Sequence, residues 1–343
     1  MVELIKHPSD LKDIDQNEFG ALVEAHRREL RAHCYRMLGS LQEADEMVQE
    51  TFWRAWDRRE TYAGRSTLRA WLYKIATNLC IDALRQRPRR ALPITLEDAS
   101  SLEQPIPASI YEPIWLEPYP FDLPAPEDDN PEAKYSMSES IKLAFLASLH
   151  LLTPRQRAVL ILCDVLDWQL AEAAGVLDQT VSSVKSALHR ARSTLARRHP
   201  SLQWEVNTDP ISGEELHGRL DRYVKAWETA DMSGLVALLK DDCTFSMPPI
   251  PSWYTGRDTI AGLVSMTIFS GQASGRWRLV PTRANGQTGF GLYLLNPEKA
   301  IYEGYGIQVV TWDGDLIADI TTFRNPALIP YFDLPKSPPT FFR

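Results

Sequence analysis

The chain has 343 residues, of which 44% are hydrophobic and 24% are charged, and its formal net charge is −8. This composition is typical of a globular protein in water, and the length favours two or three domains. No run of about 18 apolar residues occurs, so we expect no transmembrane helix and no membrane contact. Residues 1–17 form a polar N-terminal extension unlike a secretory signal. Four widely spaced cysteines favour buried free thiols in the cytoplasm over disulfides or zinc.

The charge is distributed unevenly along the chain. Residues 91–135 hold one Lys/Arg against ten Asp/Glu. Residues 1–90 hold 16 basic against 14 acidic residues, and residues 136–204 hold 8 against 5. Two mildly basic segments therefore flank a strongly acidic one, and the negative total does not exclude a nucleic-acid partner.

Residues 18–90 have the apolar periodicity of a helical bundle. One stripe runs from Phe19 to Leu38 and ends at Gly39, a second runs over residues 44–55, and a third runs over residues 68–83. We therefore predict an all-α domain over residues 18–90.

The second of these helices, residues 43–56, is rich in acidic and aromatic residues. One interpretation is an amphipathic helix with a solvated face. The other is a docking surface for a large partner, because aromatic side chains are common hot spots of interfaces. The candidate docking residues are Glu43, Asp45, Glu46, Gln49, Glu50, Phe52 and Trp53.

The third helix and the loop before it combine aromatic, polar and cationic side chains. Such groups hold an unstacked base and neutralise phosphates. The candidate DNA contacts here are Tyr62, Arg65, Lys74, Asn78 and Arg85. A core position is favoured for Trp71, whereas Tyr62 fits a core position and a DNA contact equally well.

Residues 91–135 contain nine of the 24 prolines, too many for a helix or a central strand. We predict a stiff, acidic linker. Its apolar runs at residues 114–116 and 119–121 suggest that parts of it dock on another surface, although a solvated spacer is equally consistent with its composition.

Residues 136–200 are again helical, and Thr153-Pro154 marks a helix start. Near the end, a helix, a turn at Asp178 and a long helix with five Lys/Arg and no acid over residues 185–198 form a helix-turn-helix pattern. One face of the last helix is apolar, and the other suits the major groove of DNA. The groove-facing candidates are Ser183, Lys185, Ser186, His189 and Arg190.

Residues 205–333 change from helical to strand-like patterns, with hairpin signals at Asn285-Gly286 and Asp313-Gly314. We predict an α+β domain followed by a tail over residues 334–343. The candidate pocket residues are Phe245, Met247, Trp253, Tyr254, Trp277 and Tyr293, although aromatics at such positions also fit a plain core. Asp242, Asp258 and His217 form no distinctive catalytic pattern. We expect no catalytic residue, no metal site and no cofactor.

The helix over residues 43–56, together with Trp71–Asn78 and Asp82–Arg85, resembles region 2 of bacterial sigma-70 family factors of the extracytoplasmic-function type. Residues 152–195 resemble their region 4. The resemblance implies a transcription initiation factor whose partners are core RNA polymerase and promoter DNA. In this family the helix matching residues 43–56 grips the polymerase clamp helices. The third helix and its loop read and open the −10 element, and the region 4 helix reads the −35 element. The equivalent linker threads toward the polymerase active centre.

The C-terminal domain resembles SnoaL-like domains, which are cone-shaped α+β folds with an apolar pocket. The similarity rests on Met247-Pro248-Pro249, residues 253–257 and residues 322–326. Such a domain replaces a separate anti-sigma protein in a subset of sigma factors. We therefore expect it to regulate activity, with a small ligand in its pocket and no separate anti-sigma factor. The expected fold class is two all-α sigma modules, a region 2 bundle and a region 4 helix-turn-helix, followed by this α+β domain.

Two other functions are compatible with parts of the chain. A ligand-sensing helix-turn-helix regulator would act without core polymerase, but it leaves residues 43–56 unexplained. A SnoaL-like enzyme fused to a DNA-binding module would require turnover by the C-terminal domain.

Overall fold

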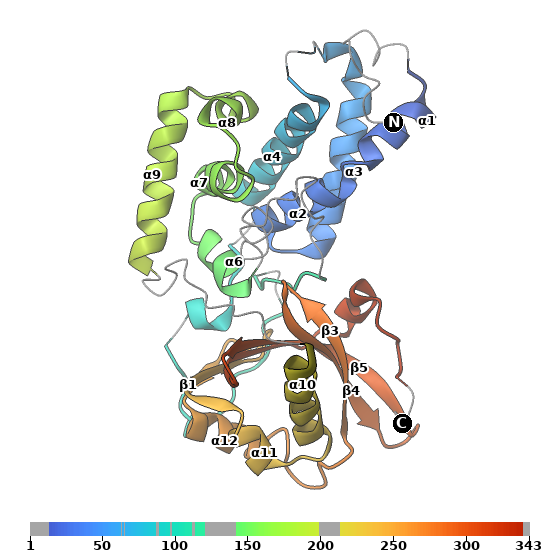
Figure 1. Cartoon of the computed structure of the whole chain (residues 1–343), viewed down its shortest axis with the longest axis vertical. Coiled ribbons are helices and arrows are strands. Elements are labelled where there is room, and N and C mark those ends of the chain that lie inside the picture. The colour runs from blue at the N-terminus through green and yellow to red at the C-terminus, as the bar shows by residue number, and fades with distance from the viewer. Residues whose placement is uncertain are drawn as a thin grey trace. The chain divides into compact units, whose positions relative to one another are not determined.

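The computed structural model describes residues 14–62, 64, 66–86, 89–96, 98–111, 114–120, 142–198 and 213–338. The chain forms two compact units, one of Met1–Arg90 and Asp122–Gln203, the other of Ala91–Phe121 and Trp204–Arg343 (Figure 1). Most of the predicted N-terminal extension, part of the predicted linker and the end of the tail lie outside the described residues. Within those ranges, no helix combines the length and the apolarity that a membrane crossing needs.

The first part of unit 1 consists of four helices: α1 (Gln16–Glu24), α2 (Arg27–Leu38), α3 (Leu41–Asp57) and α4 (Leu68–Gln86), with a short 3₁₀ turn, η3 (Arg59–Thr61). Asp15 and Ser40 cap α1 and α3 by accepting hydrogen bonds from backbone N–H groups of the first turn. Gly39 ends α2 in the left-handed conformation, with φ of 73°. The predicted helical bundle is confirmed.

The second part of unit 1 contains α6 (Leu143–Leu149), α7 (Pro154–Leu160), a π-helical turn η5 (Ile161–Val165), α8 (Leu170–Leu177) and α9 (Val181–Arg198). Thr153 and Gln156 form the capping box that starts α7. Asp178 ends α8 with φ of 50°, so the turn uses aspartate where glycine is the commoner residue. The helix-turn-helix is confirmed, and its first helix begins at Leu170.

In the C-terminal part of unit 2, two helices come first: α10 (Gly213–Glu228) and α11 (Met232–Val236). The strands are β1 (Leu239–Ser246), β2 (Trp253–Thr255), β3 (Trp277–Ala284), β4 (Gln287–Asn296), β5 (Ile301–Asp313) and β6 (Leu316–Phe323). Helix α12 (Arg257–Met266) follows β2, and a 3₁₀ segment η6 (Pro326–Phe332) follows β6. Strands β1 and β2 occupy residues for which the sequence suggested no strand.

The six strands form one sheet in the order β2-β1-β6-β5-β4-β3, in which β1 pairs in parallel with β6 and the other pairs are antiparallel. Asn285-Gly286, with φ values of 55° and 68°, links β3 to β4, and Gly314 lies in the turn between β5 and β6. Figure 1 shows the sheet curving around α10. Helices followed by a curved sheet confirm the predicted α+β domain.

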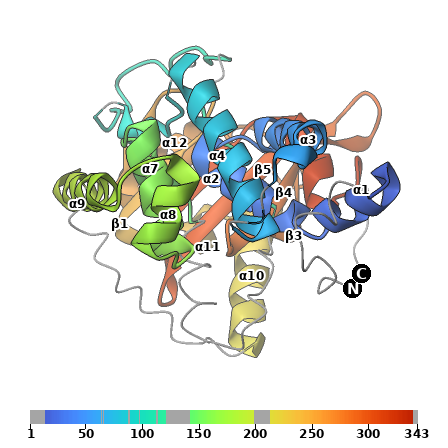
Figure 2. The ribbon, with the colours of Figure 1, turned by 90° about the horizontal axis from the view of Figure 1, so that it is seen from above.

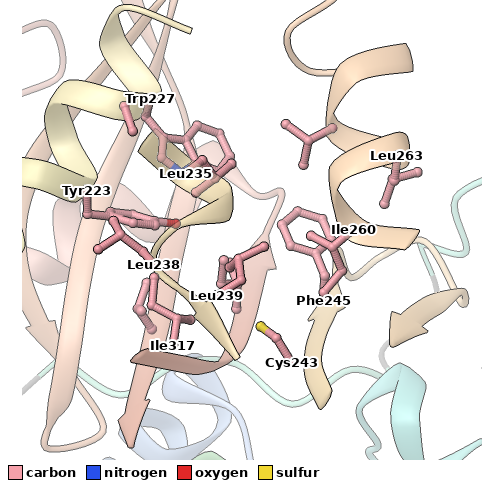
Figure 3. Packing of buried hydrophobic residues seen from close by; sticks show 14 of the residues in the cluster. Tyr223, Trp227, Leu235, Leu238, Leu239, Cys243, Phe245, Ile260, Leu263 and Ile317 are labelled. Carbon is pink, nitrogen blue, oxygen red and sulfur yellow. The ribbon is translucent and has the colours of Figure 1, made fainter. Parts of the chain in front are cut away.

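The core of unit 2 fills the space between the helices and the concave face of the sheet. Figure 3 shows Tyr223 and Trp227 of α10 on one side of this core and Phe245 of β1 beside Ile260 and Leu263 of α12 on the other. All five are at most 2% exposed. Burial on this scale stabilises the domain by about 25 cal/mol for each Å² of apolar surface.

Residues 91–120, called the strap below, pack onto the C-terminal domain and are not a free linker. The strap contains the 3₁₀ turn η4 (Pro93–Thr95). The Ser100 N–H donates to the Trp253 carbonyl, and the Ile110 N–H donates to the Pro249 carbonyl, both at 2.8 Å. Leu102 packs against the core so closely that a Cβ on Gly262 would lie 2.7 Å from its Cδ1. These contacts make the first two thirds of the predicted linker a structural part of unit 2.

The end of the strap is held by Asn285. The Tyr119 N–H donates to the Asn285 side-chain oxygen at 2.9 Å, and the Asn285 N–H donates to the Tyr119 carbonyl at 2.9 Å. Asn285 is fully buried. One hairpin residue therefore supplies both the left-handed turn and the anchor for the strap.

Candidate polymerase and promoter interfaces

Helix α3 presents the predicted docking face. Its buried side consists of Leu41, Ala44, Val48, Thr51 and Ala55, which pack into the helical bundle. On its outer side Trp53 is 61% exposed, the largest exposure of any tryptophan among the described residues. An indole with this exposure adds nothing to the core, so its position fits an interface residue.

Several acidic residues of α3 already form ion pairs within the protein. Glu43 is almost buried, and its carboxylate accepts from Arg90 at 2.8 Å. Asp45 pairs with Arg31 at 2.6 Å, and Glu50 pairs with Arg54 at 2.7 Å. Glu43 is therefore paired within unit 1, with a residue 47 positions further along the chain.

The remaining predicted docking residues lie at the surface. Glu46 and Gln49 are exposed. The Phe52 ring lies under the Arg27 guanidinium, 5.0 Å from its carbon atom. Together with Trp53 these side chains form a mixed acidic and aromatic face along α3.

The predicted −10 residues are not brought together as one exposed surface. Tyr62 is only 7% exposed, its hydroxyl donates to the Ser66 carbonyl at 2.6 Å, and its ring lies 5.2 Å from that of Trp71. Burial raises the pKa of the Tyr62 hydroxyl. The sequence was equally consistent with a core position and a DNA contact for Tyr62. The structure places it in the core. Arg65 lies outside the described residues.

Helix α4 carries the other three −10 candidates. Asn78 is exposed on this helix. Arg85 pairs with Asp82 at 2.8 Å near the surface. The Lys74 ammonium contacts the Asp178 carboxylate at 2.6 Å. Lys74, Asn78 and Arg85 therefore give α4 a polar and cationic character, and Lys74 forms an ion pair with Asp178.

All five predicted −35 residues are exposed on one side of α9: Ser183, Lys185, Ser186, His189 and Arg190. The opposite side is buried through Val184, Ala187, Leu188 and Ala191. This division into a packed and a solvated face follows the 3.6-residue period of the helix. The Ser183 hydroxyl donates to Gln179 at 3.0 Å, which ties the start of the face to the turn.

Arg192 has a structural role that the sequence did not reveal. Its guanidinium donates twice to Asp164, at 3.0 and 2.6 Å, and this bond to Asp164 raises the pKa of Arg192. Asp164 lies in the π-helical turn η5, so the pair fixes the angle of α9 against the preceding segment. The pairing depends on the π turn, which no sequence pattern indicated.

The six predicted pocket residues differ in their surroundings. Phe245, Met247, Tyr254 and Trp277 belong to the packed core. Trp253 is partly exposed, and Tyr293 lies outside this core, with its hydroxyl donating to the Pro335 carbonyl at 2.6 Å. A depression of about 480 Å³ is lined instead by Ala230, Phe269 and residues 271–274. Four of the six pocket candidates are therefore part of the packed core.

Two of the catalytic candidates named from the sequence, Asp242 and Asp258, are exposed in unit 2. The Asp242 side chain is 79% exposed, and the side chain of His217 lies outside the described residues. No group of three or more His, Cys, Asp or Glu side chains that could hold a metal ion occurs in the described ranges.

Comparisons with known proteins agree with this architecture. Residues 22–90 match the family Sigma-70 region 2, and residues 142–195 match Sigma-70, region 4. The chain is 38% identical over 332 residues to the ECF RNA polymerase sigma factor SigG of Mycobacterium tuberculosis, which covers 97% of this chain and 87% of that protein. It is 29% identical over 194 residues to SigW of Bacillus subtilis, covering 56% of this chain and 95% of that protein.

A solved structure shares the fold over almost the whole chain. The crystal structure of the Mycobacterium tuberculosis extracytoplasmic function sigma factor SigJ aligns with a TM-score of 0.57 at 22% identity, covering 92% of this chain and 100% of that one. A match to region 2 is not expected of a helix-turn-helix regulator that acts alone. The chain therefore belongs to the ECF family of RNA polymerase sigma factors, which bind core RNA polymerase and promoter DNA.

Proposed function

We propose that α9 reads the −35 element, that α4 contacts the −10 element, and that the outer face of α3 docks on core polymerase. The observation that carries the proposal is the α9 face, where all five candidate residues are exposed opposite a buried stripe. Lys185 and Arg190 supply the charge for phosphates and base edges, and the serines supply short hydrogen-bonding groups. On α4, exposed Asn78 is suited to a base edge, while Lys74 and Arg85 are suited to phosphates.

Alanine at Lys185 or at Arg190 is expected to lower promoter-dependent transcription about tenfold, because each DNA contact of this kind contributes about 1–3 kcal/mol. The measurement is transcription in vitro by core polymerase plus the variant, on a promoter selected from genomic DNA by the holoenzyme. Ser193→Ala, at another exposed position of α9, is the matched control. If Lys185→Ala and Arg190→Ala both bind core and transcribe as the wild type does, α9 does not recognise the promoter.

We further propose that the C-terminal domain regulates the factor in place of a separate anti-sigma protein. The support is the strap, which follows region 2 in the chain and is bound by this domain through Ser100, Ile110 and Tyr119. A small ligand is not needed for this role, since the domain's aromatic interior is packed.

Asn285→Ala tests this role without removing the domain. The substitution removes the acceptor for the Tyr119 N–H and places alanine at a left-handed φ of 55°, so the end of the strap should be released. Losing a buried hydrogen bond costs about 1–3 kcal/mol, and we expect proteolysis of residues 91–120 to be about fivefold faster or more, together with a changed transcript yield. Asn285→Gly also lacks the side-chain amide but tolerates the left-handed turn. It therefore separates the loss of the hydrogen bond from the strain in the turn. Faster cleavage without any change in transcription would contradict the regulatory role.

A further inference from the structure

The depression of about 480 Å³ in unit 2 lies at the ends of two helices of the C-terminal domain. Ala230, one of its lining residues, lies between α10 and α11, and the others belong to the loop that joins α12 to β3. Helix α11 lies between α10 and α12 in both views of the ribbon (Figures 1 and 2). Sites for small molecules have volumes of about 300–1,000 Å³, so the depression is large enough for one.

The apolar part of the depression is held in place by the core of the domain. The Phe269 ring lies edge-on to that of Trp227, with 5.7 Å between the ring centres. The Trp227 ring in turn lies 6.0 Å from that of Trp277. Because Phe269 packs against these buried rings, it offers a fixed apolar surface to the depression, next to Ala273.

Most carbonyl groups of the loop over residues 267–276 already accept hydrogen bonds from the protein. The Arg276 guanidinium donates to the carbonyls of Ser270, at 2.8 Å, and Gln272, at 3.4 Å. The Tyr302 hydroxyl donates to the Gly275 carbonyl at 2.6 Å. Donors from the same domain also reach the carbonyls of Thr267, Ile268, Gly271 and Ala273. The loop therefore has few acceptors left for a ligand.

The N–H groups that line the depression are available instead. Among the described residues, no acceptor bonds the backbone N–H of Gly271, Gln272 or Ser274, and all three residues are exposed. Gly271 has φ of 66° and Gly275 has φ of 73°. Turns with such left-handed residues gather backbone N–H groups into concavities that bind anions.

Arg276 adds a positive charge beside these donors. A Cβ atom at Gly271 would lie 3.8 Å from the Arg276 Nη2, so the guanidinium lies directly behind the loop. Its hydrogen bonds go to carbonyl groups, and in the described part of the chain no carboxylate pairs with it. The nearby Glu228 is paired with Arg278 at 2.9 Å. Free donors and an uncompensated cation together favour a negatively charged group.

We propose that this depression binds a small molecule with an apolar body and one anionic group, such as a carboxylate. The apolar body lies on Phe269 and Ala273, and the anionic group accepts from the N–H groups of Gln272 and Ser274, with Arg276 behind them. The site is distinct from the interior pocket expected from the sequence. It does not depend on the proposed promoter and polymerase contacts.

Octanoate and 1-octanol are matched probes for this site, because they share an alkyl chain and differ in charge. Amide NMR spectra of the full-length protein are recorded during titration with each. Octanoate should shift the amide signals of Gly271, Gln272 and Ser274 until they saturate. 1-Octanol should bind at least about tenfold more weakly, because it lacks the charge that strengthens hydrogen bonds. Octanoate without saturable shifts at these amides, or equal affinities for the two probes, would overturn the site.

Two substitutions test the parts of the site separately. Ser274→Trp fills the depression from an exposed position and should abolish octanoate binding, whereas Thr255→Trp, at an exposed position of β2, should not. Arg276→Gln should weaken octanoate binding about tenfold, whereas Arg283→Gln, an exposed position of β3, should leave it unchanged. Wild-type affinity in Ser274→Trp would show that octanoate binds elsewhere. Wild-type affinity in Arg276→Gln would contradict the anionic part of the proposal.

Discussion

Replacing Trp53 by alanine is expected to weaken binding to core polymerase at least about thirtyfold. Trp53 is 61% exposed on α3, so its loss removes interface area without opening a cavity in the bundle. Exposed tryptophans that become buried at an interface are common hot spots, with losses of 2 kcal/mol or more on truncation to alanine. Titration of labelled factor with core polymerase gives the Kd directly.

Met266→Ala is the matched control for this experiment. Met266 lies on α12 and is 58% exposed, so the change removes a comparable exposed apolar side chain from the other unit. We expect wild-type core affinity from it. Equal affinities for Trp53→Ala and the wild type would show that the aromatic face of α3 is not the docking surface.

Acid is expected to destabilise unit 1 by several kcal/mol, with His33 as a main cause. His33 is fully buried between α2 and α4, where its Nε2 lies 2.9 Å from the Thr77 hydroxyl. Burial, with a smaller contribution from the Arg36 charge, lowers the pKa of His33 to about 3. Burial and the Arg157 charge also lower the pKa of His150 well below its usual value.

The direction follows from proton binding. Between pH 6.5 and 3 an unfolded chain protonates the His33 imidazole, whereas the folded unit keeps it neutral. Acid in this window therefore favours unfolding by about 1.4 kcal/mol per pH unit through His33, and the full contribution of this residue to stability is present above pH 6.5. The lowered pKa of His150 acts in the same direction. Hydrogen exchange of the α2 and α4 amides at pH 7.5 and 5.0 reports on this unit alone.

His33→Gln isolates the contribution of this one imidazole. Glutamine keeps a polar group near Thr77 but does not titrate, so the variant should be less stable at pH 7.5 yet lose less stability between pH 7.5 and 5.0. The expected difference in that loss is about 2 kcal/mol. An identical pH dependence in both proteins would show that His33 is protonated in the folded unit.

Short-range patterns predicted most of the elements. The Thr153-Pro154 helix start, the left-handed Asp178 and the Asn285-Gly286 hairpin lie where the sequence indicated them. Each depends on backbone conformation and on hydrogen bonds between residues close in the chain. The exposed face of α9 was predicted for the same reason, because helical periodicity alone separates its two sides.

Other contacts depend on partners far away in the chain. Glu43, a docking candidate, forms an ion pair with Arg90. Tyr293 was grouped with the pocket, but its hydroxyl bonds Pro335. The strap was expected to be a linker with docked apolar runs, and its contacts with the C-terminal domain agree with the docking, because proline excludes helix and central strand but does not prevent packing against another surface.

The sequence by itself determined the two sigma modules, the helix-turn-helix, the α+β domain and the face of α9 that meets solvent. Periodicity, capping residues and turn residues act over a few positions, so they can be read without a structure. Only the tertiary structure decided that Trp168 and Asp178 rest on α4, and that Asn285 holds the strap. These contacts join residues about 95 to 165 positions apart, and complementary shape and charge at such separations leave no periodic signal in one chain.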